Sequence, residues 1–316
     1  MENSPRVQSP ASKASGLIPR GSLPDYLLLH FVILLWSLTA NLGKAITLIS
    51  PVLVAYRTAI AAIGLAVVMI AQGTESLNGR TIRDSFLVGM FIGVHWCLFF
   101  LATQVGSVSV CLIGAATCSL WCALVEPWFG TGRTVGKLEL GMGVSVLIGT
   151  AVMVFDNSLS LWGLTFGMMS AAIGAVFSFY NGRLVQRAPY LPISFYEMCG
   201  ACFLTACVSG IMKRFQPDLR LIPDRVEVGY LLLLGLVCTS FAYTAYMAVL
   251  QRISVYSVCL TSNLEPVYGI LLAAVLYHEH EKSQLPFWIG SAIIVLSVSA
   301  YPLLKSRSTS PSLESE

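Results

Sequence analysis

The stretch SNLEPVYGILLAAVLYHEH, residues 262–280, carries an amide, a carboxylate and a proline in an otherwise apolar run. These residues are Asn263, Glu265 and Pro266. An ionised carboxylate in an apolar environment is costly unless it is protonated, paired or in contact with water. Proline removes a backbone donor, which frees a carbonyl one turn earlier, at Ser262. The group predicts a locally broken helix that lines a polar cavity, with Glu265 exchanging a proton. In the structural alternative, Glu265 only anchors neighbouring helices by hydrogen bonding.

Three further titratable side chains lie inside apolar segments: Arg57, Glu197 and His95. Arg57 and Glu197 each follow a tyrosine and fall at similar places in two different segments, which favours a substrate or gating role. Each could instead bind a backbone carbonyl or a hydroxyl, or extend to an interface. His95 could carry a proton or contact substrate, or could be a core residue with satisfied hydrogen bonds.

Lys44 closes the first apolar segment and could be a cavity cation or an interface residue. Trp36, Tyr180 and Tyr243 could stack on a planar substrate. Tryptophan and tyrosine also populate membrane interfaces and helix seams. The candidate cavity or coupling residues are therefore Glu265, Asn263, Pro266, Arg57, Glu197, His95, Lys44, Trp36, Tyr180 and Tyr243.

Neither a metal, a cofactor nor an enzymatic reaction is predicted. The nine cysteines lie in apolar segments, where they act as small hydrophobic side chains. The Cys199-x-x-Cys202 pair has no second Cys or His pair at a ligand spacing. The His278–Glu281 cluster is typical of a solvated helix end. Since the sequence has no P-loop, nucleophile elbow or HExxH motif, ATP hydrolysis and membrane proteolysis are not supported.

The composition indicates an integral membrane protein, because 56% of residues are hydrophobic, 11% are charged and the mean hydropathy is +0.75. Apolar segments of about 20 residues predict membrane-spanning helices. The fold class expected is all-α integral membrane, with ten transmembrane helices. The predicted spans are 25–48, 51–72, 85–104, 106–128, 137–155, 161–182, 192–212, 228–250, 253–277 and 284–304.

The basic residues predict the orientation. Most Lys and Arg fall on the cytoplasmic side if the N-terminus is placed there, as the positive-inside rule requires. The main exceptions are Lys213, Arg214, Arg220 and Arg225, which share one loop. We therefore expect both termini in the cytoplasm, with disordered or short tails at 1–24 and 305–316.

Two short similarities indicate an internal duplication. SVSVCL at 107–112 recurs as SVYSVCL at 254–260, and PVLVAYR at 51–57 has a looser counterpart in PISFYE at 192–197. Five spans per half would make the second copy enter the membrane from the opposite side. The expected organisation is a 5+5 inverted repeat, with units at 25–155 and 161–304. The spacing Gly163-x-x-x-Gly167 predicts close helix packing.

Four stretches resemble the EamA family of the drug/metabolite transporter (DMT) superfamily. They are WSLTANLGKAI with the following Arg57, HWCLFFLA, NLEPVYGILLAAVLYHE and WIGSAIIVLSV. The first half departs from the family pattern, with Cys118 where a proline is frequent and Thr131 near the position that matches Glu279.

This resemblance implies a multi-pass protein of the bacterial inner membrane. It implies a secondary-active exporter or exchanger of small metabolites, amino-acid-like or drug-like, that works by alternating access with protons as a possible coupling ion. Two alternatives stay open: a flippase of lipid intermediates with the same fold, and a membrane sensor or scaffold that does not transport.

Overall fold

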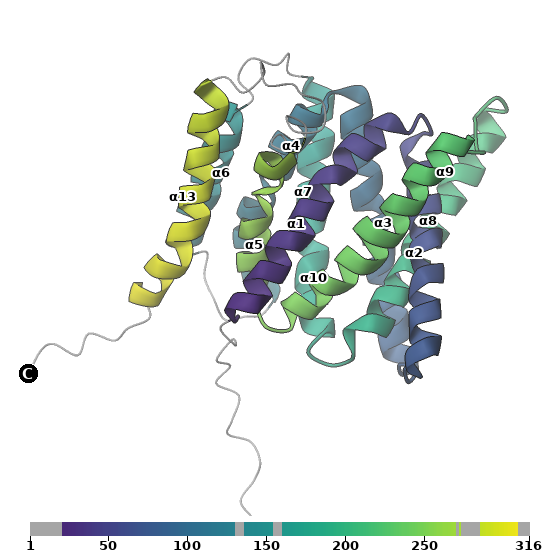
Figure 1. Cartoon of the computed structure of the whole chain (residues 1–316), viewed down its shortest axis with the longest axis horizontal. Coiled ribbons are helices and arrows are strands. Elements are labelled where there is room, and N and C mark those ends of the chain that lie inside the picture. Colours follow the sequence, from purple (N-terminus) through teal and green to yellow (C-terminus); the bar gives the residue numbers. More distant parts are fainter. Residues whose placement is uncertain (1–20, 130–135, 154–159, 270–271, 273–284, 309–316) are drawn as a thin grey trace, which may run out of the picture.

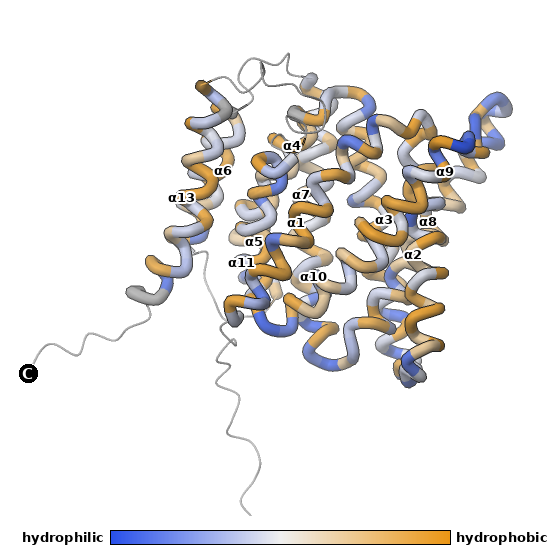
Figure 2. The backbone as a smooth tube through the Cα atoms, in the orientation of Figure 1, coloured by the Kyte–Doolittle hydropathy of each residue, from blue (hydrophilic) through white to orange (hydrophobic). Residues whose placement is uncertain are grey.

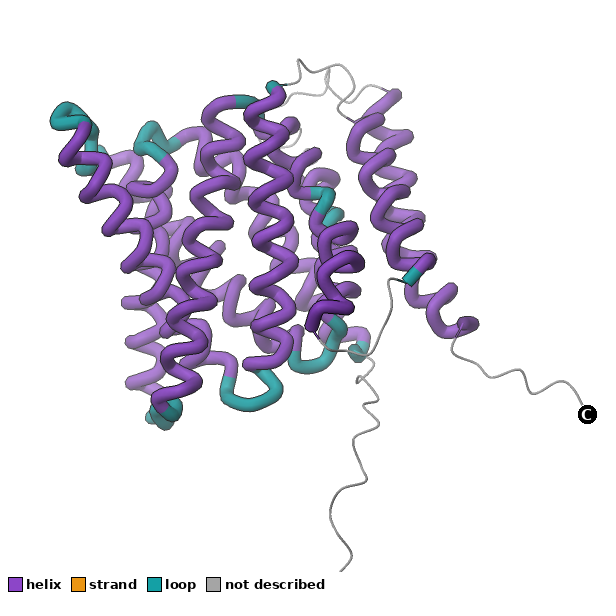
Figure 3. The backbone as a smooth tube through the Cα atoms, turned by 180° about the vertical axis from the view of Figure 1, so that it is seen from behind, coloured by secondary structure: helices purple, strands orange, loops and turns teal. Residues whose placement is uncertain are grey.

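The computed structural model describes residues 21–129, 136–153, 160–269, 272 and 285–308, and within these ranges every regular element is a helix (Figure 3). The helices are α1 (Leu23–Ala45), α2 (Ser50–Gln72), α3 (Gly79–Val105), α4 (Val108–Ala115), α5 (Cys118–Val125), the 3-10 turn η1 (Glu126–Phe129), α6 (Lys137–Met153), α7 (Leu161–Leu184), α8 (Tyr190–Phe215), α9 (Arg225–Leu232), the π-helical segment η2 (Leu233–Phe241), α10 (Ala242–Leu250), α11 (Val255–Ser262) and α13 (Leu285–Ser308). Residues 265–269 are also helical.

Eight of the described helical segments are long and apolar enough to cross a membrane. They correspond to eight of the ten predicted spans, with ends displaced by a few residues. The predicted spans 137–155 and 253–277 fall partly outside the described residues, so their full extent stays a prediction. Helix α13 continues to Ser308, past the predicted end of the last span at 304.

Polar residues lie mostly at the ends of the helices, and apolar residues run along their lengths (Figure 2). Large apolar side chains are exposed on the outer surface, among them Ile70 at 82% and Leu296 at 68%. Such a surface suits lipid and not water, because apolar side chains exposed along whole helices would be costly in solution.

The repeated SV…CL sequences begin two interrupted helices. The Ser107 hydroxyl caps α4 by accepting from the backbone N–H of Val110 at 3.2 Å, and the Ser254 hydroxyl caps α11 by accepting from that of Ser257 at 3.2 Å. Both helices end after eight residues. The chain then turns and a second helix begins, α5 after the first break and the helical residues 265–269 after the other. The two similar sequences therefore begin the same local structure, a capped helix followed by a break.

Helices α2, α3 and α8 lie on one side of the bundle, and α6 and α13 lie on the other (Figure 1). The long helix α3 packs on α7 and α8, and α2 packs on α8 and η2. Helix α1 packs on α10 and η2, whereas α6 and α13 pack on each other.

Glycines permit the closest of these crossings. A Cβ built at Gly89 of α3 would lie 2.1 Å from the Glu197 carbonyl oxygen of α8, so only glycine fits there. A Cβ at Gly163 would lie 3.1 Å from the Cα of Gly106, and one at Gly167 would lie 3.1 Å from the Cα of Gly114. The close packing predicted from Gly163-x-x-x-Gly167 is confirmed: α7 meets the end of α3 at Gly163 and α4 at Gly167.

Candidate functional site

A cavity lies inside the bundle, between the two interrupted helices. It offers about 130 Å³ to the centres of water-sized molecules. One water needs about 10–15 Å³ by this measure, so the cavity has room for several waters or part of a small metabolite. Seven of the residues predicted from the sequence line it: Trp36, Arg57, His95, Tyr243, Asn263, Glu265 and Pro266.

Arg57 is the most deeply buried charge on the cavity wall, with only 2% of its surface exposed. Its Nε donates to the Thr239 hydroxyl at 2.6 Å, and its guanidinium carbon lies 4.1 Å from the centre of the Trp96 ring. A cation over an indole face is worth about 2 kcal/mol or more when desolvated. Trp96 and Thr239 thus hold a positive charge beside the cavity.

The π-helical segment η2 places Thr239 for this contact. The Thr239 hydroxyl donates to the Leu234 carbonyl at 2.7 Å, five residues earlier, and accepts from Arg57. The wider turn of a π-helix is frequent at functional sites because it displaces one side chain from the regular helical position. Thr239 was not predicted from the sequence, because a π-helical segment has no simple sequence pattern.

Glu265 and Asn263 lie at the break after α11. Glu265 is half-buried and lines the cavity, and Asn263 is 4% exposed. The Asn263 Nδ2 has no hydrogen-bond acceptor in the described part of the chain, although an unsatisfied buried amide is costly. Glu265 is near enough to Arg57 for electrostatic attraction, but the described contacts include no salt bridge between them. The Arg57 cation, the Glu265 carboxyl group and the Asn263 Nδ2 donor therefore lie on the same cavity.

Glu197 does not line the cavity, but it is hydrogen-bonded to Tyr243, which does. The Tyr243 hydroxyl donates to Glu197 Oε2 at 2.9 Å and accepts from the Asn181 side-chain amide at 2.7 Å. All three residues are buried. The other Glu197 oxygen and the Asn181 oxygen lack a donor in the described part of the chain. Asn181 is a second site residue that was not predicted from the sequence.

His95 is fixed against α7. Its Nδ1 lies 2.7 Å from the Ser170 carbonyl oxygen, which can only accept, so Nδ1 carries the proton. The Ser170 hydroxyl donates to the His95 carbonyl at 2.9 Å. In the neutral ring Nε2 is then an acceptor, so His95 is anchored by one nitrogen and keeps the other for a proton or a donor group.

Aromatic rings form the remaining walls. Trp36 packs on Tyr246 with ring centres 5.3 Å apart, and Trp96 meets Tyr243 edge-on at 6.0 Å. Tyr246 donates to the Ser178 hydroxyl at 3.0 Å, which leaves its ring face on the cavity. These rings provide apolar, planar surface beside the charged groups.

Two predicted residues lie elsewhere. Lys44 is exposed at the end of α1, and Tyr180 is 43% exposed and packs edge-on against Phe129 at 5.0 Å. Neither lines the cavity. The Cys199–Cys202 pair is half-buried on α8, also away from the cavity, and residues 278–281 lie outside the described residues.

An arginine–carboxylate contact lies near each end of α1. At the start of α1, Asp25 accepts from Arg252 at 2.8 Å. Beyond its other end, Glu227 accepts from Arg220 and from the backbone N–H of Thr47 at 2.8 Å. Helix α1 has 23 residues, and its length of about 35 Å at 1.5 Å per residue separates the two contacts.

A membrane bundle that gathers charged side chains around an interior cavity is the arrangement of membrane transport proteins. The chain is a multi-pass membrane protein with such a cavity. Residues 161–301, from α7 through most of α13, match the EamA-like transporter family. This match confirms, for the second half of the chain, the resemblance to the EamA family predicted from the sequence.

The fold of the whole chain is also similar to a solved crystal structure, with a TM-score of 0.73 at 20% sequence identity. The similarity covers 92% of this chain and 100% of the other. At this identity the likeness establishes the fold alone. No curated protein matches the sequence.

Proposed function

We propose that the chain is a secondary-active transporter that exports or exchanges a small metabolite by alternating access. The observation that carries the proposal is the placement of Arg57 and Glu265, two opposite charges, on one interior cavity beside an interrupted helix. Buried charges in a membrane protein are costly, and they mark a substrate or ion pathway by default. Transport, and not an enzymatic reaction, accounts for them.

The proposed architecture is ten transmembrane helices in a 5+5 inverted repeat, with units at 25–155 and 161–304. Its support is the pair of capped, interrupted helices that begin at Ser107 and Ser254. A two-fold axis between the halves would exchange α2 with α8, and α3 with the span that contains η2. The contact of α3 with α8 would then correspond to the contact of η2 with α2, and the structure has both contacts. Interrupted helices at a repeat interface typically border the transported substrate.

The cavity chemistry favours a small amino-acid-like or drug-like substrate that combines charged or polar groups with an apolar part. Arg57 would bind a carboxylate or another anionic group. Glu265 would bind a cationic group or a proton, and the free Asn263 Nδ2 would donate to an acceptor. Trp36 and Tyr246 would cover the apolar part of the molecule.

Glu265 is the proposed coupling residue. A carboxylate at this depth is favoured in its neutral form when the cavity is dry and in its charged form when a cation is close. Binding a proton or a cationic substrate at Glu265 would therefore be alternative ways to neutralise it. Protons would be the coupling ion under this scheme.

We infer that the protein resides in a bacterial inner membrane with both termini in the cytoplasm. The support is the distribution of basic residues. In this orientation the Asp25–Arg252 contact closes the cytoplasmic end and the Glu227–Arg220 contact closes the outer end.

Counterflow in proteoliposomes tests the function. Vesicles loaded with one unlabelled metabolite from a library should accumulate the same compound in labelled form, and Arg57→Ala should abolish the accumulation. Lys44→Gln is the matched control, because it removes a cation outside the cavity and should leave flux unchanged. A well-folded Arg57→Ala protein with wild-type counterflow would contradict the proposal.

The same experiment separates the two other functions. A flippase would move fluorescent lipid intermediates and leave water-soluble metabolites in place. A sensor would bind a compound in a thermal-shift assay and give no counterflow with it.

A further inference from the structure

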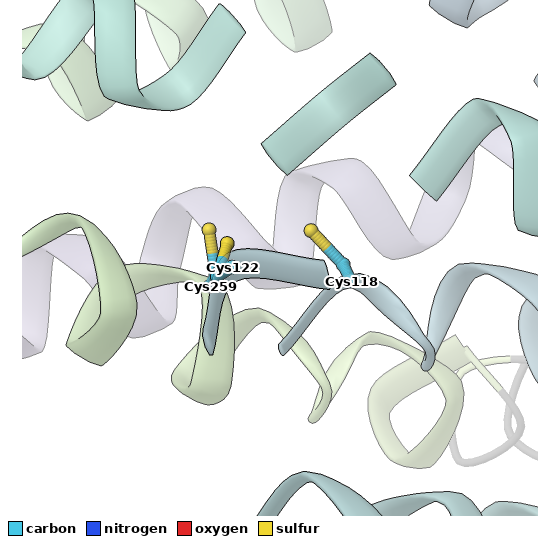
Figure 4. Close-up of side chains that lie close together, drawn as sticks. All are labelled: Cys118, Cys122 and Cys259. Carbon is cyan, nitrogen blue, oxygen red and sulfur yellow. The ribbon is translucent and has the colours of Figure 1, made fainter. Parts of the chain in front are cut away.

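Three cysteines converge where the two interrupted helices meet. Their Sγ atoms all lie within 4.8 Å of one another (Figure 4). Cys118 and Cys122 are one turn apart on α5, which puts them on the same face of that helix, and Cys259 comes from α11. Cys122 and Cys259 are buried, and Cys118 is half-buried.

The distances suit a shared ligand. Sulfur ligands of one metal ion, each about 2.3 Å from it, lie roughly 3.8–4.0 Å apart in tetrahedral or trigonal geometry. Small side-chain movements would bring three Sγ atoms within 4.8 Å to this separation. Cysteines that serve only as small hydrophobic residues need no such convergence from two helices.

An entry path exists as well. Cys118 and Cys259 belong to the wall of the interior cavity, so an ion in the cavity would reach the thiols without crossing the packed core. Within the described residues, neither a histidine nitrogen nor a carboxylate oxygen joins the cluster. The site would therefore supply three sulfur ligands and leave any fourth position to the cavity.

We propose that Cys118, Cys122 and Cys259 form a binding site for a soft, thiophilic d10 metal ion, Cu(I) or Zn²⁺. Thiolates select these ions over Mg²⁺ and Ca²⁺, which require oxygen ligands. Binding releases the thiol protons to water, since the thiolate is the ligand. The bound ion links α5 to α11, which are segments of the two interrupted helices.

The two ions differ in what the site offers them. Cu(I) is satisfied by three sulfurs, whereas Zn²⁺ usually takes four ligands and would add a water on the cavity side. Three thiolates leave a net charge of −1 around Zn²⁺ and −2 around Cu(I), and the smaller charge is less costly to bury. The three available sulfur ligands therefore favour Cu(I), and the smaller net charge of the buried complex favours Zn²⁺.

The test is metal binding by the purified, reduced full-length protein in detergent. Titration against a competing chelator, with Zn²⁺ in one arm and Cu(I) in the other, should give one metal per chain. X-ray absorption should show three sulfur ligands, at about 2.3 Å for Zn²⁺. The arm with the tighter binding identifies the preferred ion.

Single Cys118→Ser, Cys122→Ser and Cys259→Ser variants should each bind at least about tenfold more weakly, because loss of even a group that only orients a metal ligand costs that much. The matched control is the double variant Cys199→Ser/Cys202→Ser, which removes the C-x-x-C pair on α8 and should bind as the wild type does. Thermal melting without metal establishes that each variant is folded. A further variant that keeps only the three clustered cysteines should retain the site.

Binding of wild-type affinity in Cys259→Ser, or loss of binding in the Cys199→Ser/Cys202→Ser protein, would overturn the assignment. So would a folded wild-type protein that binds neither ion at micromolar concentration, or a bound ion with only nitrogen and oxygen ligands. None of these readouts depends on transport, so a failure here and a failure of the proposed function are distinguishable.

Discussion

Glu265 combines a position on the cavity with a neighbouring cation, Arg57, and an adjacent helix break. The glutamine variant keeps its shape and most of its hydrogen bonding but cannot titrate. If Glu265 carries the coupling proton, Glu265→Gln should fold normally, lose accumulation driven by a pH gradient and keep substrate exchange. Gradient-driven uptake and counterflow, measured on the same vesicles, separate the two activities.

The leucine variant provides the structural comparison. If Glu265 only anchors helices, Gln should be nearly silent in both assays and Leu should lower the melting temperature in detergent. Unchanged gradient-driven uptake in a well-folded Glu265→Gln protein would refute proton coupling at this residue.

Tyr243 connects Glu197 and Asn181 through a single hydroxyl. Tyr243→Phe removes that hydroxyl and leaves a buried carboxyl and a buried amide without it, so we expect a loss of about 1–3 kcal/mol in the free energy of unfolding. Tyr246→Phe is the matched control, because the Tyr246 hydroxyl contacts only the Ser178 hydroxyl in the described part of the chain. The control should lose about 1 kcal/mol or less. Denaturant unfolding in mixed micelles measures both, and an equal loss would show that the Glu197 contact contributes nothing.

At the scale of the helices, the crossing of α3 and α8 depends on the absence of a side chain at Gly89. A methyl group there would lie 2.1 Å from the Glu197 carbonyl oxygen, and backbone cannot move aside as a side chain can. We expect Gly89→Ala to lower the melting temperature strongly and to reduce the yield of monodisperse protein. Because α8 carries Glu197, the variant should also disturb the cavity wall.

Gly79 on the same helix supplies the control. A Cβ at Gly79 meets nothing within 4 Å, so Gly79→Ala should be neutral or stabilise α3 by up to about 1 kcal/mol, as alanine is the better helix former. Size-exclusion profiles and melting curves of the two proteins test the difference. Equal behaviour would mean that the two helices can separate without cost.

At the scale of the whole molecule, alternating access requires the two end contacts to break in turn. Asp25→Asn weakens the contact with Arg252, and Glu227→Gln weakens the contact with Arg220, at opposite ends of α1. We expect each variant to favour the conformation that opens at its own end. The measurement is alkylation of a single cysteine at Ser262, which lines the cavity, in a background without other cysteines.

A membrane-impermeant maleimide, added to oriented vesicles from one side and then the other, reports the opening. Asp25→Asn should speed labelling from the Asp25 side and Glu227→Gln from the opposite side. Faster labelling from the same side in both variants would contradict alternating access through this cavity. With the proposed orientation, the Asp25 side is the cytoplasm.

The membrane class, eight of the ten spans and the resemblance to the EamA family could be predicted from the sequence. These follow from local properties: the length of an apolar segment fixes whether it can cross the bilayer, and a buried charge such as Arg57 or Glu265 stands out because lipid makes it costly. The similar SV…CL sequences indicated a duplication, which stays a prediction; in the structure the first Ser of each caps its own helix. Hydropathy also placed most span ends to within a few residues.

Which of these residues line the same cavity depends on how the helices pack. Seven candidates line one cavity, Lys44 and Tyr180 do not, and Glu197 reaches it only through Tyr243. Hydropathy places a residue along a helix, but the direction of its side chain depends on helix rotation and crossing, which contacts between distant segments set. A π-helical turn places Thr239 beside Arg57, and the packing of α11 on α5 places Cys259 beside Cys118 and Cys122. Spacing along the chain carries no information about such meetings, because packing between helices far apart in the sequence produces them.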